Sequence, residues 1–216
     1  MASGFPGSID NFTDPLSNSP LNSPSHSTLH SDVNDAVEKI ETYMGLVKVI
    51  PTSVTGGTLA ANGTITIGTA VSSVVVSGAF SSLYDNYKII VDGGTASTGA
   101  SFNLQFGSTT SGYHYAGIYN QYSASTPLGL ATQVGASFVE AGRTSTTGNS
   151  MNVEVFGPFL SQRTGYRSNS TDYNTVGFLV NAAGFLNDTT SYTAFTVKPT
   201  SGTITGGTIR VYGYRN

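Results

Sequence analysis

The sequence predicts a mainly β protein, an antiparallel and jelly-roll-like β-sandwich preceded by an extended arm and one short α-helix. Two observations carry this prediction. From residue 52 onward, short runs rich in Val, Ile, Tyr, Phe and Thr alternate with clusters of Gly, Ser, Asn and Thr, as strands alternate with turns. Helical spacing of apolar residues is confined to residues 29–45. We therefore divide the chain into an anchoring arm (1–28), a trimerising helix with a hinge (29–51) and a sandwich domain (52–216).

The N-terminal arm is predicted to be extended and to have no core of its own. Its prolines are spaced among Ser and Asn residues, which favour turns over regular structure. We interpret it as a segment that lies along the surface of another protein, and the alternative is a disordered tail. Five dispersed apolar side chains are the predicted anchors: Phe5, Ile9, Phe12, Leu16 and Leu21.

The predicted helix has one apolar side. Its apolar residues recur at alternating steps of four and three, which is the spacing of a coiled-coil seam. Because a single helix of this length is marginal in water, the seam needs cover, either from the sandwich of its own chain or from identical helices. We favour identical helices in a parallel bundle around a threefold axis. The predicted interface residues are Leu29, Val33, Ala36, Val37, Ile40 and Met44.

The sandwich domain is predicted to contain nine short strands. They are expected over residues 64–67, 73–77, 87–91, 102–106, 113–119, 151–156, 175–180, 192–197 and 208–214. Two of them show the period of two that separates a buried face from a solvated face. The residues expected to point inward are Phe102, Leu104 and Phe106 in one strand and Met151, Val153 and Val155 in the other.

Composition excludes several classes of function. Only 10% of the residues are charged, where a soluble globular chain carries roughly 25%, so Ser, Thr, Asn, Gly and Tyr must keep the surface soluble. The net charge of −3 argues against a nucleic-acid partner. The chain has no cysteine, which rules out disulfides and thiolate zinc sites, and no apolar run approaches the roughly 18 residues of a membrane span. We expect no signal peptide and no membrane insertion.

No catalytic or metal constellation is expected. His26 and His30 have the i, i+4 spacing that could place two imidazoles on one ion at a threefold axis, but hydrogen bonding at the helix start is the preferred interpretation. The chain lacks a Gly-x-Ser-x-Gly elbow, and most acids of the C-terminal part stand beside turn residues. We therefore predict no enzyme activity, no cofactor and no metal, with a glycan-degrading enzyme as the remaining catalytic alternative.

One aromatic-rich stretch is a candidate glycan contact. Tyrosine rings near loops stack on sugars, although tyrosine is also favoured in strands and in the core. The candidate residues are Tyr113, His114, Tyr115, Tyr119 and Tyr122.

Several stretches resemble small virion proteins of tailed bacteriophages. The opening Phe5-Pro6-x-x-Ile9-Asp10-x-Phe12, the bridge Leu21-Asn22-Ser23-Pro24-Ser25-His26 and residues 30–41, HSDVNDAVEKIE, resemble their N-terminal module. The stretch Gly207-Thr208-Ile209-Arg210-Val211-Tyr212-Gly213-Tyr214-Arg215 resembles the final strand of their β-sandwich domains, and residues 80–87, before an Ile-Ile-Val strand, are similar as well. Proteins of this group are described as head-decoration, head-fibre or tail-fibre-like proteins.

The resemblance implies a non-enzymatic structural protein of a virion. The expected form is a homotrimer of the capsid-decoration or head-fibre type, on the head surface in preference to the tail. Its arm is expected to bind the major capsid protein or another virion protein. The alternative is a tail-fibre or receptor-binding protein whose sandwich contacts glycans of the host surface. No catalytic residue and no cofactor follow from the resemblance.

Overall fold

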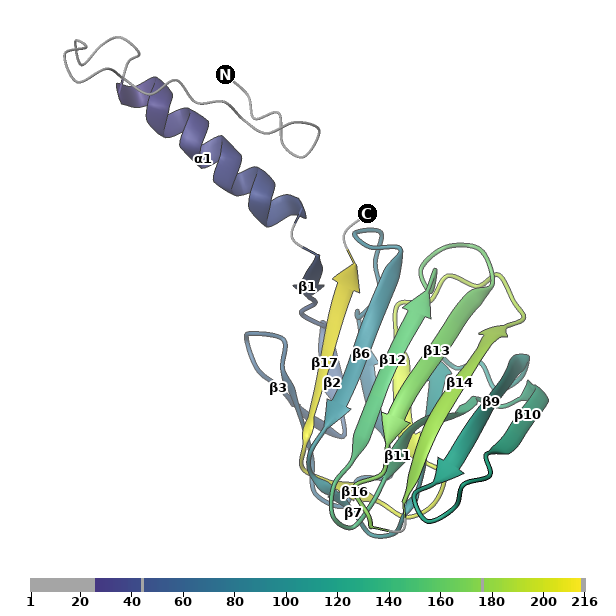
Figure 1. Ribbon diagram of the computed structural model, residues 1–216. Coiled ribbons are helices and arrows are strands. Elements are labelled where there is room, and N and C mark those ends of the chain that lie inside the picture. The colour runs from purple at the N-terminus through teal and green to yellow at the C-terminus, as the bar shows by residue number, and fades with distance from the viewer. Residues whose placement is uncertain (1–25, 44, 176, 215–216) are drawn as a thin grey trace. The chain divides into compact units, whose positions relative to one another are not determined.

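The computed structural model describes residues 26–43, 45–175 and 177–214 (Figure 1). Within them the protein is mainly β with one short helix, as the sequence predicts. The helix, α1 (His26–Tyr43), begins at His26 instead of Leu29 and belongs to one compact unit, while residues 47–214 form a second compact unit. The five predicted anchors of the arm lie outside the described residues: Phe5, Ile9, Phe12, Leu16 and Leu21.

The second unit consists of two facing layers of antiparallel strands, which we call the front sheet and the back sheet (Figure 1). In spatial order the front sheet contains β10 (Leu128–Gly135), β9 (Tyr113–Gln121), β14 (Phe178–Leu186), β13 (Thr164–Thr171), β12 (Ser150–Phe156), β6 (Asn86–Asp92) and β17 (Thr208–Tyr214). Strands β1 (Leu46–Lys48) and β4 (Ile65–Ile67) pair with β17, and β3 (Gly57–Leu59) pairs with β4.

The back sheet contains β11 (Phe138–Thr144), β8 (Ala100–Phe106), β15 (Phe195–Pro199), β5 (Val74–Ser77) and β2 (Ser53–Thr55). Strands β7 (Thr95–Ala96) and β16 (Ile204–Thr205) form a separate ribbon. The end of β11 also pairs with the start of β12, so that the hydrogen-bonded ladder runs through 15 strands.

The strand order is that of a jelly roll with an inserted hairpin. From β5 onward the chain crosses repeatedly between the sheets, and it returns through β15 to lie beside β5, where it started. The back sheet thereby has the order β5–β15–β8–β11, and the front sheet has β6, β14, β9 and β10 in the complementary places. The hairpin β12–β13 is inserted between β6 and β14. It widens the front sheet beyond the back sheet.

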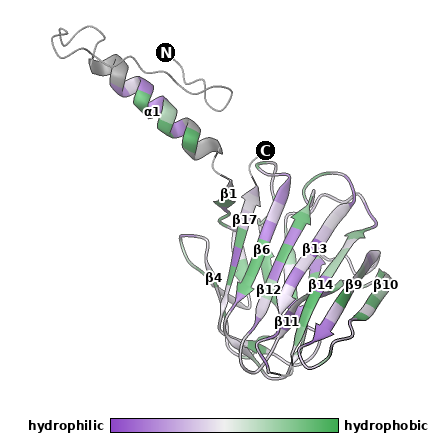
Figure 2. Cartoon of the chain, in the orientation of Figure 1, coloured by the Kyte–Doolittle hydropathy of each residue, from purple (hydrophilic) through white to green (hydrophobic). Residues whose placement is uncertain are grey.

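The core lies between the two sheets, and the predicted registers of two strands are confirmed. Met151, Val153 and Val155 of β12 are buried, and hydrophobic and hydrophilic residues alternate along this sheet (Figure 2). Phe102, Leu104 and Phe106 of β8 are fully buried. At the centre, the ring of Phe138 stacks on that of Tyr166, with 4.1 Å between the centroids. The side chains that a one-residue slip would bury therefore stay on the outer faces.

Three long strands, β10, β11 and β13, were not predicted, because their sequences do not alternate regularly between apolar and polar residues. In β13 two of the buried, inward-facing residues are Ser168 and Ser170, so this face of the strand is not apolar in sequence. The β11 register shifts between Phe138 and Gly142, and this bulge breaks the alternation. Strand β10 is an edge strand. The strand expected over 175–180 runs over Phe178–Leu186 instead, and just before it the Gly177 amide donates a hydrogen bond of 2.9 Å to the Asn174 carbonyl oxygen.

Candidate functional site

The apolar side of α1 is open to solvent in the described chain. Val33, Val37 and Ile40 are 51%, 47% and 46% exposed. Ala36 is half-buried. Of the other predicted interface residues, the side chain of Leu29 and the whole of Met44 lie outside the description. Three apolar side chains at coiled-coil spacing thus lack the burial that would stabilise them.

Strand alternation separates the five predicted glycan-contacting residues. Tyr113 and Tyr115 of β9 point inward and are buried, and Tyr115 lines a cavity together with Tyr119. The Tyr113 hydroxyl accepts a hydrogen bond of 2.8 Å from the Phe106 amide, and burial raises the pKa of Tyr113. These two tyrosines serve the core.

The other three residues of that stretch lie in three different places. His114 points outward and stacks on Phe185, with 5.1 Å between the ring centroids. Tyr119 packs edge-on against Phe178. Tyr122 is about half exposed and donates a hydrogen bond of 2.8 Å to the carbonyl oxygen of Asp172. The structure does not bring the five residues together on one surface.

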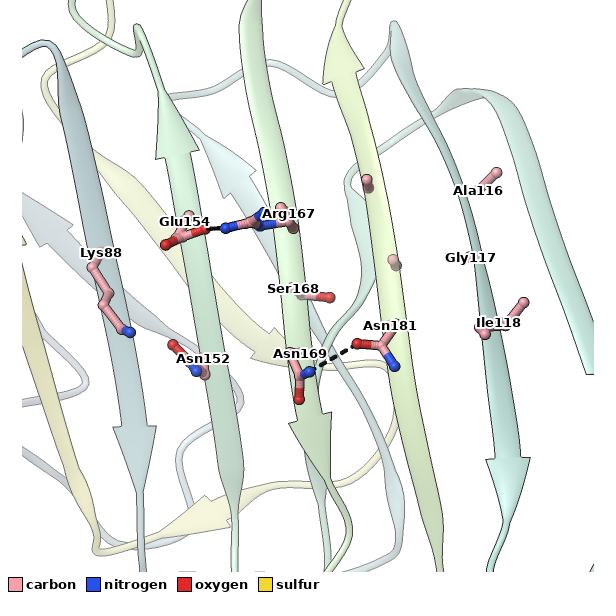
Figure 3. A pocket seen from close by; sticks show the side chains of 12 residues that line it. Lys88, Ala116, Gly117, Ile118, Asn152, Glu154, Arg167, Ser168, Asn169 and Asn181 are labelled. Carbon is pink, nitrogen blue, oxygen red and sulfur yellow. Dashed lines mark hydrogen bonds and ion pairs between the residues drawn. The ribbon is translucent and has the colours of Figure 1, made fainter. Parts of the chain in front are cut away.

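The outward face of the front sheet carries a hollow of about 570 Å³, which we call the outer hollow (Figure 3). Side chains from β6, β12, β13, β14 and β9 line it, so it crosses the middle of the sheet. Its polar lining residues on the outer face are Lys88, Asn152, Glu154, Arg167, Asn169 and Asn181, and the buried Ser168 also borders it. Their positions follow from the same alternation that buries their neighbours.

The floor of the outer hollow is low because its side chains are small. Ala183 of β14 is the cross-strand partner of both Arg167 and Ala116, so two alanines continue the row that begins at Arg167. Gly117 adds to the close approach of β9 and β14, because a Cβ there would lie 2.3 Å from the Asn181 carbonyl oxygen. Larger residues at these positions would fill the hollow or separate the strands.

A carboxylate held by two partners forms one side of the outer hollow. Arg167 lies across from Glu154, and its Nε donates a hydrogen bond of 2.8 Å to Glu154 Oε2 (Figure 3). The Tyr214 hydroxyl donates a bond of 2.6 Å to Glu154 Oε1. The bond from Tyr214 and then the Arg167 guanidinium lower the pKa of Glu154. Lys88 faces Glu154 from β6 and makes no hydrogen bond or ion pair with any described residue.

A row of amides forms the other side of the outer hollow. Asn169 Nδ2 donates a hydrogen bond of 2.8 Å to Asn181 Oδ1 across β13 and β14 (Figure 3). Asn152 lies one step beyond the Val153–Ser168 pair and therefore beside Asn169 on the same face. The arrangement presents hydrogen-bond donors and acceptors on three neighbouring strands, with a guanidinium and an ammonium beside them.

A second cavity, the inner cleft, has a volume of about 380 Å³ and opens between β9–β10 and β11. Arg143 lies in its wall, 13% exposed, and donates hydrogen bonds of 2.7 Å to Ser101 Oγ and 3.1 Å to Glu140 Oε2. Its guanidinium lies over the ring of Phe178, and the buried Asp172 carboxylate is 3.9 Å from its Nε. This group was not predicted, because acids in this part of the sequence were interpreted as turn residues.

The two histidines considered as metal ligands are described only in part. His30 is exposed on α1, and the side chain of His26 lies outside the description. Among the described residues no group of three or more His, Asp or Glu side chains is placed to hold an ion. In the same part of the chain, no helix has the length and apolar character needed to cross a bilayer.

Comparison of the chain with protein-family models, with curated proteins and with solved structures found no match.

Proposed function

We propose that this protein is a non-enzymatic structural protein of a bacteriophage virion, a homotrimer of the capsid-decoration or head-fibre type. The observation that carries the proposal is the exposed apolar row Val33, Val37 and Ile40 on α1. Fully burying side chains of this size stabilises a protein by roughly 1.5 to 3 kcal/mol each. Three parallel copies of α1 would remove the row from water, and coiled-coil spacing is what such packing needs.

The sandwich fits a part that is displayed on a larger assembly. Its surface is poor in charge and rich in hydroxyl groups, and its strands bury a complete core without help from a partner. The resemblance of the N-terminal stretches to phage virion proteins supplies the proposed location. In this arrangement the arm binds the major capsid protein or another virion protein, the helices join three chains, and the sandwiches project outward.

Measuring the oligomeric state tests whether α1 joins the chains. We expect the full-length protein to be a trimer by size-exclusion chromatography with light scattering, and Ile40→Asp to be a monomer because it puts a charge into the apolar row. Ser31→Asp is the matched control, since it adds the same charge on the opposite side of α1. A trimeric Ile40→Asp variant, or a monomeric parent chain, would show that α1 does not join the copies.

The location is tested on purified phage particles. A decoration protein is expected in many copies per particle by gel densitometry, and particles without it should lose capsid stability. A receptor-binding protein is expected in few copies, and its loss should prevent adsorption. Absence of the protein from the particles would overturn the proposed location in both forms.

The alternative function is that of a tail-fibre or receptor-binding protein that contacts host surface glycans. One observation favours it, namely the outer hollow with its lining of amide and charged side chains. Such a protein binds the glycan without cleaving it. Incubation with host polysaccharide is therefore expected to release no new reducing ends, and their appearance would point to an enzyme.

A further inference from the structure

We propose that the outer hollow binds an anionic saccharide chain whose acidic group is a carboxylate or a phosphate. The inference names the ligand class for the receptor-binding alternative and rests on it. Three features of the hollow support it. They are the row of amides, the two basic side chains beside that row, and the floor of small apolar residues.

The amide row matches the repeat of a sugar chain. Asn152, Asn169 and Asn181 lie on adjacent strands, which are about 4.8 Å apart in a sheet, and this spacing is close to the length of one pyranose unit. With the Asn169–Asn181 bond formed, Asn169 Oδ1 still accepts and Asn181 Nδ2 still donates. Asn152 offers both groups. A chain that crosses the strands therefore meets an amide at each step, and amides pair well with sugar hydroxyls.

The charges beside this row favour an anion. Glu154 already accepts hydrogen bonds from Arg167 and Tyr214, whereas Lys88 makes no hydrogen bond or ion pair with a described residue and acts on Glu154 only through its charge. Arg167 is 64% exposed, so a ligand can reach it. The two bases and one acid leave one positive charge in the hollow. A carboxylate or phosphate near Lys88 would gain a charge-assisted hydrogen bond, which is stronger than a bond between neutral groups.

The floor accommodates the apolar face of a sugar ring. Ala183 and Ala116 lie side by side at the bottom of the hollow, and Ile118 stands beside Asn181 with about half of its surface exposed. A pyranose ring can lay its C–H groups on these side chains while its hydroxyls point to the amides. The inner cleft does not offer this combination, because Arg143 is already bonded to Ser101 and Glu140.

The ligand class is tested by calorimetric titration of the full-length protein with oligosaccharides of equal length. The probes are an oligogalacturonate, which carries carboxylates, a phosphorylated oligomannose and a neutral maltooligosaccharide. We expect at least one anionic probe to bind at least about tenfold more tightly than the neutral probe, and its affinity to fall as salt is raised. Equal binding of all three probes, or no binding of either anionic probe, would overturn the proposal.

Variants place the binding in the outer hollow. Lys88→Gln is expected to lower the affinity for the anionic probe about tenfold. Lys198→Gln is the control, because Lys198 bonds to Gln105 on the outer face of the back sheet and should not affect binding. Ala183→Trp fills the floor without changing the charge and should abolish binding. Unchanged affinity in Lys88→Gln and Ala183→Trp would overturn the assignment.

The same titration separates this proposal from the trimer proposal. The hollow belongs to one chain, so an Ile40→Asp monomer should bind a short probe with the affinity of the parent protein. If the parent chain proves monomeric and still binds the anionic probe, the outer hollow stands and the helix assignment fails. If the trimer forms and no anionic probe binds, the helix assignment stands and the ligand proposal for the outer hollow fails.

Discussion

Valine has opposite surroundings in the two units of this protein. Val153 and Val155 of β12 are fully buried between the sheets, while Val33 and Val37 of α1 are about half exposed. The residue type is the same, so the difference lies in what each element can pack against. The sandwich supplies its own partners because each sheet covers the other. The apolar side of α1 is covered by no described residue to a comparable degree.

This difference has consequences for stability. The sandwich should unfold in a transition that does not depend on protein concentration, because its apolar contacts lie within one chain. A helix of 18 residues is marginal alone, so the folding of α1 should be linked to assembly and weaken on dilution. Changes in one unit should therefore leave the other nearly unaffected.

The largest expected effect is in the sandwich core. Phe138→Ala removes a ring that stacks on Tyr166 and meets Tyr113 edge-on at 4.9 Å. We expect a loss of about 3–5 kcal/mol in the free energy of unfolding, measured by chemical denaturation. The oligomeric state in water should not change. Loss of the trimer in a still folded variant would show that the two units depend on each other.

The next largest effect compares the loss of a buried ion pair with the loss of an exposed ion pair in the sandwich. Arg143→Met leaves the Glu140 and Asp172 carboxylates in a largely buried place without their cation, and we expect a loss of about 3 kcal/mol. Arg167→Met is the matched change on the exposed side of Glu154, and we expect less than about 1 kcal/mol. Both are read from denaturation midpoints. Equal losses would mean that burial does not distinguish the two ion pairs.

Truncating an apolar side chain of α1 is expected to cost less free energy than the changes in the sandwich, and to weaken only the assembly of the helices. Val37→Ala shortens one side chain of the apolar row, which costs about 1–2 kcal/mol per helix in a trimer that buries it. The helical circular dichroism signal should then be lost at higher protein concentration than in the parent, while the denaturation midpoint of the sandwich stays the same. A shifted sandwich midpoint would indicate that Val37 packs on the β unit.

The sequence was sufficient for the parts of the fold that alternate strictly. The inward sets of β8 and β12, Leu104 and Val153 among them, could be predicted because each strand has one apolar and one polar face. The helix could be predicted because its spacing differs from that of all other segments. Strand β13 could not, because Ser168 is buried through a hydrogen bond of 2.8 Å to the Glu140 carbonyl oxygen, a contact made 28 residues away.

The candidate site was harder to predict than the fold. The outer hollow depends on the register of five strands, and only that register places Lys88, Glu154 and Arg167 in one row. The predicted aromatic stretch does contribute to the hollow, but through Ala116 and Ile118 and not through its tyrosines. Two small residues that face each other across neighbouring strands, such as Ala183 and Ala116, cannot be recognised as partners from the sequence. Cross-strand partners are what decide such a site.

The smallest expected effect concerns the hydrogen bond between Tyr214 and Glu154. Tyr214 keeps its proton at neutral pH, because burial and the neighbouring Glu154 raise its pKa to about 12. Its hydroxyl stabilises the ionised carboxylate, which lowers the pKa of Glu154 below the ordinary value of 4.5. This contribution to stability is complete above the ordinary pKa and is lost as the pH falls through the lowered value.

Tyr214→Phe should therefore lower the free energy of unfolding by up to about 1 kcal/mol at pH 7. The difference from the parent protein should shrink as the pH falls through the lowered pKa of Glu154, because the carboxylate then becomes protonated in both proteins. Urea denaturation at a series of pH values measures it. If the difference stayed constant down to about pH 2, the Tyr214 hydroxyl would be acting through packing and not through the charge of Glu154.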